Sequence, residues 1–224
     1  MNERKELILN TIIKEHIKTA SPVGSGVLVE KYKLNISPAT VRNEMAALEE
    51  EGYIVQPHTS AGRVPTEKAY KLYLENLKEK NIDNKDIENI LKKRDEASFK
   101  EVAKLVSQIS GNTVFWAFHK NNLYYTGISN LFQQPEFSQL QLIHSISGII
   151  DRIDEIIDEM FEDIEEGEQV LIGSENPFGN FCSTVMAKYT LDGKNGIFGI
   201  IGPMRMDYEK NISLVKQINK LISE

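Results

Sequence analysis

The chain has 224 residues, of which 41% are hydrophobic and 26% are charged, a composition typical of a globular protein with room for two ordinary domains. It contains no apolar run of the roughly 20 residues that a membrane-spanning helix needs. Its amphipathic start does not predict a secretory signal. Cys182 is the only cysteine, so an intrachain disulfide is excluded and a reducing, cytoplasmic location is expected.

The formal net charge of -7 is unevenly distributed along the chain. Residues 1–80 contain 12 Lys and Arg against 11 Asp and Glu, whereas residues 81–224 contain 14 against 22. A polyanion would therefore be approached by the first part and repelled by the second. This asymmetry permits nucleic-acid binding by residues 1–80, although it does not demonstrate it.

The first part begins with three predicted helices. Apolar residues at helical spacing indicate a first helix from about 3 to 18. A second, short helix follows, with Ser25 expected as its N-cap. Ser37 and Pro38 open the third helix, because serine caps a helix well and proline fits its first position. Gly52 ends that helix.

A short two-stranded unit follows the third helix. Residues 53–55 predict one strand and Val64 begins the return strand, with the polar loop 56–63 between them. Pro65-Thr66 then opens a linker helix. Three helices followed by a two-stranded loop are the plan of a winged helix-turn-helix, whose third helix enters the major groove of DNA. We therefore predict a DNA-binding domain over residues 1–80.

The third helix has two different faces. Val41, Met45 and Leu48 share the face predicted to lie in the core, and small or polar residues occupy the other. Small residues let a helix sit deep in the groove, where asparagine pairs with adenine, arginine pairs with guanine and an alanine methyl meets a thymine methyl. The predicted DNA-contacting residues are Ser37, Ala39, Thr40, Arg42, Asn43 and Ala46 in the helix and His58, Thr59, Ser60 and Arg63 in the wing. The alternative to DNA contact is an ordinary helix with a solvated outer face. The polar wing that follows the helix favours DNA contact.

Residues 81–224 predict an α+β domain around a small antiparallel sheet. The expected helices span about 84–95, 98–110 (capped by Ser98), 137–165 and 207–223. The expected strands span 113–118, 123–126, 170–172, 185–189 and 197–201.

Three stretches of the first part are distinctive. They are Pro-Val-Gly-Ser at 22–25, Ser-Pro-Ala-Thr-Val-Arg-Asn-Glu-Met-Ala-Ala-Leu-Glu at 37–49 and Gln-Pro-His-Thr-Ser-Ala-Gly-Arg-Val-Pro-Thr at 56–66. With Ile-Gly-Pro-Met-Arg-Met-Asp-Tyr at 201–208, they make the sequence resemble the heat-inducible transcription repressor family, HrcA. The resemblance implies a winged helix-turn-helix followed by a GAF-like α+β domain. It also implies repression of chaperone operons from an inverted-repeat operator, with a chaperonin assisting the active state.

The sequence departs from the family pattern at several places. Met204 stands where threonine is usual, and Ala69-Tyr70-Lys71 stands where Gly-Tyr-Arg is usual. The chain is also shorter than a typical member, whose GAF-like domain carries an inserted domain that helps dimerisation. Here the strands at 113–118 and 123–126 are joined by a short polar turn, so we expect that insert to be absent.

No other site is predicted. The four histidines and Cys182 lack metal-ligand spacing, so neither a metal nor a cofactor is expected. The acidic series between 151 and 163 is interpreted as the solvated face of an amphipathic helix. No nucleophile has a neighbouring base, so we do not expect an enzyme.

The sequence thus predicts a DNA-binding repressor that acts as a homodimer. The apolar stripes of the linker helix, of the helix at 84–95 and of residues 149–164 are the candidate dimer surfaces. Two alternatives stay open: a winged-helix repressor controlled by a small effector bound in the α+β domain, and a protein-interaction module.

Overall fold

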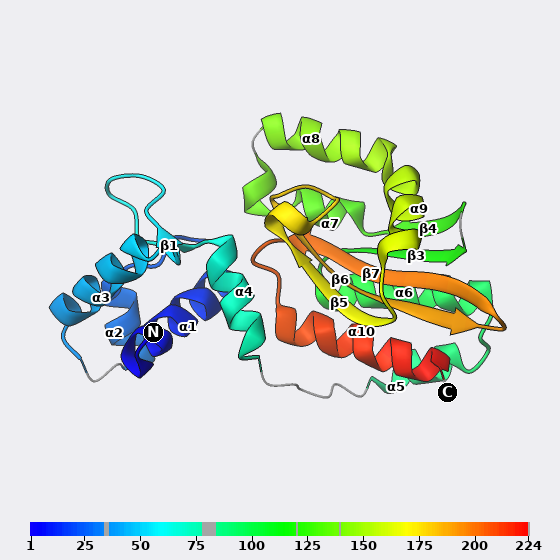
Figure 1. Cartoon of the computed structure of the whole chain (residues 1–224), viewed down its shortest axis with the longest axis horizontal. Helices are drawn as coiled ribbons and strands as arrows, with labels where there is room; N and C mark the ends of the chain where they lie inside the picture. Colours follow the sequence, from blue (N-terminus) through cyan, green and yellow to red (C-terminus); the bar gives the residue numbers. More distant parts are fainter. Residues whose placement is uncertain (34–35, 78–83, 120, 139, 224) are drawn as a thin grey trace. The chain divides into compact units, whose positions relative to one another are not determined.

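The computed structural model describes residues 1–33, 36–77, 84–119, 121–138 and 140–223 (Figure 1). The chain divides into two compact units, Met1–Leu77 and Lys78–Glu224.

The first unit is a small helical domain with a two-stranded wing. Its elements are α1 (Glu3–Thr19), α2 (Ser25–Tyr32), α3 (Pro38–Glu50), β1 (Ile54–Val55), β2 (Val64–Pro65) and α4 (Glu67–Glu75). β1 and β2 pair antiparallel, with Ile54 opposite Pro65. Val23, between α1 and α2, adds an antiparallel bridge to Arg63, with N–O distances of 2.8 and 2.9 Å. The order of elements confirms the predicted winged helix-turn-helix.

Helix caps in this unit agree with the sequence at α3 and differ at α2. Ser37 caps α3 as predicted, because its hydroxyl accepts a hydrogen bond from the backbone N–H of Thr40 at 3.1 Å. Ser25 is not the cap of α2. Gly24 adopts the extended backbone that an N-cap needs, and Ser25 is the first helical residue. The Ser25 hydroxyl instead accepts a hydrogen bond from Nε of Arg42 at 3.3 Å.

The second unit is built on one antiparallel sheet of five strands in the order β4-β3-β7-β6-β5. The strands are β3 (Thr113–His119), β4 (Asn122–Thr126), β5 (Gly167–Ile172), β6 (Cys182–Leu191) and β7 (Lys194–Pro203). The helices are α5 (Lys85–Leu91), α6 (Glu96–Ser110), α7 (Ile128–Phe132), α8 (Leu140–Asp151), α9 (Ile153–Asp163) and α10 (Tyr208–Ser223), with 3-10 turns at Pro135–Ser138 and Gly173–Glu175. This confirms the predicted α+β class.

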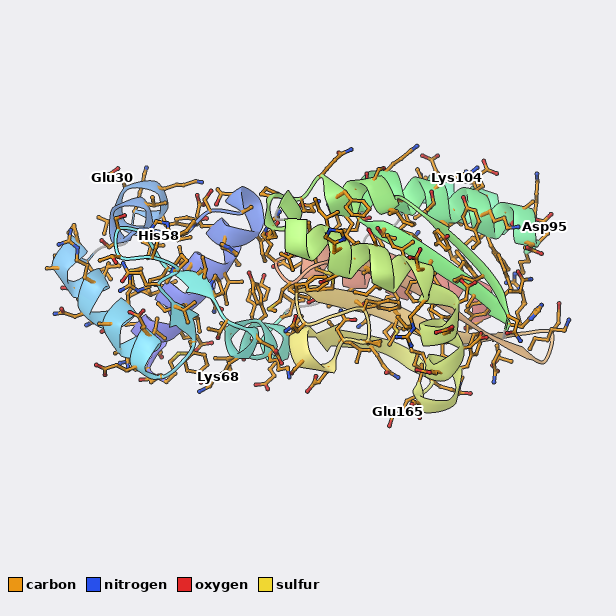
Figure 2. All side chains as sticks on the ribbon, turned by 90° about the horizontal axis from the view of Figure 1, so that it is seen from above. Glu30, His58, Lys68, Asp95, Lys104 and Glu165 are labelled. Atoms are coloured by element: carbon orange, nitrogen blue, oxygen red, sulfur yellow. The ribbon has the colours of Figure 1, made fainter. Side chains whose placement is uncertain are left out.

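Helices cover both faces of the sheet (Figures 1 and 2). Side chains alternate along β3, so Phe115 packs in one core with Ile153 and Ile157 of α9. Trp116 points the other way and stacks on Phe99 of α6, with ring centroids 4.8 Å apart. The unit therefore has three layers: α5, α6 and α10 on one side, the sheet, and α7, α8 and α9 on the other.

Three predicted helices of this unit have different boundaries. The helix expected over 84–95 is α5, which ends at Leu91. Ser98 was expected to cap the helix at 98–110, but α6 begins at Glu96 with Asp95 as N-cap. Ser98 is the third residue of the helix and forms a capping box with Asp95, in which each side chain accepts a hydrogen bond from the backbone N–H of the other residue. The helix expected over 137–165 is divided into α8 and α9 at Arg152, whose backbone is not helical. A straight helix of that length would extend roughly 43 Å. That exceeds the roughly 33 Å of the longest strands, so a break keeps both segments on the sheet.

Candidate nucleic-acid interface

Helix α3 presents the two faces that the helical wheel predicts. Val41 and Leu48 are fully buried and Met45 is 5% exposed. The opposite face is open: Ala39, Arg42, Asn43 and Ala46 are exposed, and Thr40 is half-buried. The exposed side chains are short apart from Arg42, so the helix backbone can approach a partner closely. Contact of these residues with DNA stays a prediction.

The loop of the wing is folded around one glutamine. Nε2 of Gln56 donates hydrogen bonds to the backbone carbonyls of Thr59 and Ala61, both at 3.0 Å. The side chains of His58, Thr59 and Ser60 are exposed at its tip. The loop thus has a defined internal geometry, and it directs three of the predicted contact residues into solvent.

The two arginines of the predicted site have different surroundings. Nε and Nη2 of Arg63 lie 2.9 and 2.8 Å from Oε2 of Glu49, and the Arg63 side chain is only 21% exposed. Arg42 is exposed, and its one hydrogen bond among the described residues is the contact with the Ser25 hydroxyl. Arg42 is therefore the arginine that can meet an anionic partner without first leaving a carboxylate.

A surface groove lies between the start of α2, helix α3 and the wing. Its lining comes from three places: Gly24 and Ser25 at the start of α2, Arg42 and Met45 on α3, and residues 60–63 of the wing. Hydroxyl, guanidinium and backbone groups therefore converge on one open channel. Groups of this kind bind phosphodiester oxygens in protein–DNA complexes.

Half of the ten Lys and Arg side chains of the first unit are paired with neighbouring carboxylates. Within the described residues, the ion pairs of this unit are Arg4–Glu44, Lys5–Glu51, Lys31–Glu15, Arg63–Glu49 and Lys71–Glu67. Lys68 contacts the carbonyl of Glu51 and lies 4.3 Å from the ring centroid of Tyr53. Residues 1–77 contain ten Lys and Arg and ten Asp and Glu, so the first unit has no net formal charge and no broad basic patch is expected from its composition.

Glu49 and Gln56 are not among the residues that the sequence predicts to contact DNA. Oε1 of Glu49 accepts a hydrogen bond from the backbone N–H of Gln56 at 3.1 Å, and its Oε2 accepts from Arg63. Glu49 lies at the end of α3, seven residues before Gln56 and fourteen before Arg63. Neither spacing indicates a contact by itself, because α3 ends at Glu50 and both partners lie beyond it. The contacts arise only when the wing folds back on the helix.

A second candidate site is a cavity beneath α8 in the α+β unit. Its volume is about 20 Å³, and its lining is apolar except for Thr113 and the thiol of Cys182. Burial raises the pKa of Cys182 to about 12, which keeps the thiol protonated and unreactive. A polar effector would need convergent hydrogen-bonding groups and a larger space.

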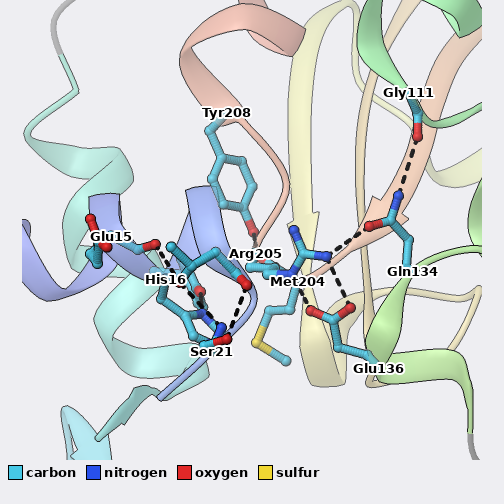
Figure 3. A network of polar contacts seen from close by, with 11 residues as sticks. Glu15, His16, Ser21, Gly111, Gln134, Glu136, Met204, Arg205 and Tyr208 are labelled. Carbon is cyan, nitrogen blue, oxygen red and sulfur yellow. Dashed lines mark hydrogen bonds and ion pairs between the residues drawn. The ribbon is translucent and has the colours of Figure 1, made fainter. Parts of the chain in front are cut away.

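The segment before α10 is tied to its own unit by polar contacts (Figure 3). Arg205 pairs with Glu136, and its Nη2 also donates to Oε1 of Gln134 at 2.7 Å. The Tyr208 hydroxyl donates to the carbonyl of Met204 at 2.5 Å. The carboxylate of Asp207 accepts a hydrogen bond from the N–H of Lys210 at 3.1 Å, as expected of a cap. These contacts support a structural role for the segment.

Two further observations concern only the described parts of the chain. No cluster of three or more His, Cys, Asp or Glu residues there is placed to bind a metal ion. None of the helices described there has the length and apolarity to cross a bilayer.

Comparison with known proteins places these features in a family. The model for the family described as "HrcA protein C terminal domain" matches residues 37–212. The heat-inducible transcription repressor HrcA of Pelotomaculum thermopropionicum is 26% identical over 340 residues, covering 100% of this chain and 96% of the relative. The repressor of the same name from Acidothermus cellulolyticus is 60% identical over 77 residues, covering 34% and 23% of the two chains.

The alignment with the first relative is longer than the 224 residues of this chain, although it covers almost all of both proteins. The relative therefore has many internal positions without a counterpart here, as expected for a shortened member. Among solved structures, one described only as a hypothetical protein at 2.2 Å resolution superposes with a TM-score of 0.81 at 18% identity. It covers 100% of this chain and 98% of the other, and so shares its fold.

The curated relatives are transcription repressors and not enzymes, which confirms the expectation of a non-catalytic protein. A repressor of transcription acts on DNA, and a winged helix-turn-helix followed by an α+β unit suits that role. The chain belongs to the HrcA family of heat-inducible transcription repressors.

Proposed function

We propose that this chain represses heat-shock chaperone genes by binding an inverted-repeat operator as a homodimer. The observation that carries the proposal is the outer face of α3, where Ala39, Asn43 and Ala46 are exposed above a buried core face. The name of the relatives supports repression linked to heat, and the family resemblance supports chaperone genes as the targets. The family resemblance supports a chaperonin as the partner that assists the active state.

In this proposal, α3 reads base edges and the surrounding groups position the duplex. The Asn43 amide pairs with an adenine, and the two alanines leave room for the helix in the groove. The groove beside α3 receives the phosphate backbone, contacted by Arg42 and Ser25. The exposed wing residues His58, Thr59 and Ser60 contact the backbone or the minor groove.

The proposal of a dimer rests on charge. Affinity for DNA grows with the number of phosphates that a protein neutralises, and one copy offers few uncompensated cations. Two copies on an inverted repeat double those contacts and match the symmetry of the site. The apolar stripes predicted as candidate surfaces lie mostly in the core of their own chain. Leu77 and Ile90 are half-buried. The buried members are Tyr70, Tyr73, Ile87, Leu91 and Ile153. We therefore do not assign the dimer interface to them.

The alternatives gain less support from the molecule. A small effector would find room for about one water molecule in the apolar cavity of about 20 Å³. A more polar hollow of about 260 Å³ beside His119, Asn122 and Asp158 is larger, and it keeps this alternative open. A protein-docking helix would be expected to expose large apolar anchors, and the outer face of α3 carries none.

Selection from a pool of random DNA duplexes with the full chain tests the proposal, because the operator is not specified in advance. The selected duplex should be an inverted repeat, and light scattering should give two copies bound to it. Asn43→Ala should weaken binding by about 1–3 kcal/mol and relax the preference at one base pair of each half-site. Asn76→Ala makes the same chemical change at the end of α4 and should bind like the wild type.

Three results would contradict the proposal. The pool could yield no preferred sequence, Asn43→Ala could leave both affinity and preference unchanged, or one copy could bind a single half-site with full affinity. The last result would remove the dimer and leave DNA binding by α3 in place.

A further inference from the structure

Three side chains connect the recognition helix to both strands of the wing. We call Glu49, Gln56 and Arg63 the wing brace. Glu49 is in the last turn of α3, Gln56 follows β1, and Arg63 precedes β2. The brace therefore closes the wing against the helix at the point where each strand meets the loop.

Both oxygens of the Glu49 carboxylate are used, each by a different strand of the wing. Oε1 accepts from the backbone N–H of Gln56 at 3.1 Å. Oε2 accepts from Nε and Nη2 of Arg63 at 2.9 and 2.8 Å. One ionised side chain thus fixes both strands, and charge-assisted hydrogen bonds of this kind are stronger than neutral ones.

The brace continues into the loop and into the base of the wing. The Gln56 side chain donates to two loop carbonyls, so its position sets the path of residues 59–61. The backbone of Arg63 pairs with Val23 through two hydrogen bonds. At Gly62 a Cβ atom would lie 2.5 Å from the carbonyl carbon of Val23, so the strand approaches too closely for a side chain.

We propose that Glu49 is a positioning residue for DNA binding, which fixes the wing relative to α3 before DNA arrives. Arg63 then acts through Glu49 and is not one of the phosphate-contacting groups, in contrast to the sequence-based prediction. This inference rests on the proposed function. The wing is then ordered in the free protein, before DNA binds. Binding therefore costs less conformational entropy than it would with a flexible wing.

Glu49→Gln is a sharp test because it keeps the size of the side chain. The amide has one acceptor oxygen, and its NH₂ group must face either the Gln56 N–H or the donors of Arg63. Either orientation places donor against donor. Glu50→Gln is the matched control: the next residue of the helix is exposed and makes no hydrogen bond or ion pair among the described residues.

Of the two variants, only Glu49→Gln should bind DNA more weakly than the wild type. Both remove one negative charge near the DNA face, which by itself favours binding to a polyanion. Glu50→Gln should therefore bind the selected duplex as tightly as the wild type or slightly tighter. Glu49→Gln should bind about tenfold more weakly, because a charge-assisted contact is lost at the wing. Equal affinities of the two variants would overturn the proposal.

Hydrogen exchange of the free protein provides a readout that does not depend on DNA. The amides of residues 54–64 should exchange faster in Glu49→Gln than in the wild type or Glu50→Gln, while the amides of α1 and α3 remain protected. Unchanged exchange in the wing would show that Glu49 does not fix it, even if the wild type binds DNA. Failure of the wild type to select any duplex would instead reject the proposed function.

The role of Arg63 is tested by combining substitutions. If Arg63 acts through Glu49, the double variant Glu49→Gln/Arg63→Gln should bind within about twofold of the weaker single variant, because residues in one network are not additive. The slope of log K against log salt for the double variant should equal that of the wild type. If Arg63 contacts a phosphate directly, the losses multiply and the slope of log K against log salt falls by about 1. That result would overturn the assignment of Arg63.

Discussion

Arg42 should account for one phosphate contact in each copy, and this can be measured as a salt effect. Its guanidinium lies in the groove between α2, α3 and the wing, and it contacts no carboxylate among the described residues. Replacement by glutamine removes the charge and keeps a polar side chain at the same exposed position. Helix propensity changes little, since arginine and glutamine are similar in helices. A change in DNA affinity will therefore report on the contact and not on folding.

The magnitude follows from counterion release. Each phosphate contact contributes about 0.9 to the slope of log K against log salt. Between about 50 and 200 mM salt, loss of one contact should reduce the ratio of wild-type to variant affinity by roughly 3.5-fold. Fluorescence anisotropy with the selected duplex measures this ratio across the salt range. Lys71→Gln, on α4, is the control of equal charge change, because Lys71 is already paired with Glu67.

Two outcomes would refute the reasoning about Arg42. Parallel salt dependences for wild type and Arg42→Gln would show that the guanidinium neutralises no phosphate. A loss of preference at one base pair would instead identify Arg42 as a base-reading residue, the role that arginine takes opposite guanine.

Three further predictions concern the stability and chemistry of the fold. Gly62→Ala should destabilise the first unit by about 1–3 kcal/mol in thermal unfolding, because its Cβ would overlap the backbone of Val23; an unchanged melting temperature contradicts this. The hydrogen bond from Lys31 lowers the pKa of Glu15 from its ordinary value of 4.5. The contact of the ionised Glu15 with Lys31 should therefore stabilise the fold at neutral pH, and this stabilisation should be lost as the pH falls below 4.5. In urea unfolding, the difference in free energy of unfolding between wild type and Glu15→Gln should become smaller in acid. Cys182 should resist a thiol reagent at pH 8 until the protein is unfolded, because burial raises the pKa of its thiol to about 12.

Local chemistry explains why the sequence predicts the recognition helix so well. Ser37 and Pro38 mark its start, and Val41, Met45 and Leu48 share one face because a helix repeats every 3.6 residues. Each of these features depends only on neighbours within two turns. The sheet of the second unit is predicted for a similar reason, since short continuous apolar runs bounded by turn residues indicate buried strands without any knowledge of their partners.

The features that the sequence does not reveal depend on contacts between distant segments. The break at Arg152 follows from the size of the sheet that α8 and α9 cover, and no residue of the helical pattern encodes that size. Arg63 has the chemistry of a phosphate ligand, and only the return of β2 to the end of α3 brings it to Glu49. In both cases tertiary packing decides what local preference leaves open.

The pairing of basic residues inside the first unit has a consequence for specificity. Arg4, Lys5 and Arg63 carry positive charge, yet each lies against a carboxylate, so neutralising a phosphate would first require breaking an ion pair. Non-specific affinity for DNA depends on the number of phosphates neutralised and should therefore be low for one copy. In the proposed function, sequence-specific contacts such as that of Asn43 would then supply a larger share of the total affinity. A repressor that binds as proposed would gain its discrimination from base contacts and from the second copy, and it would spend little time on DNA that lacks the operator.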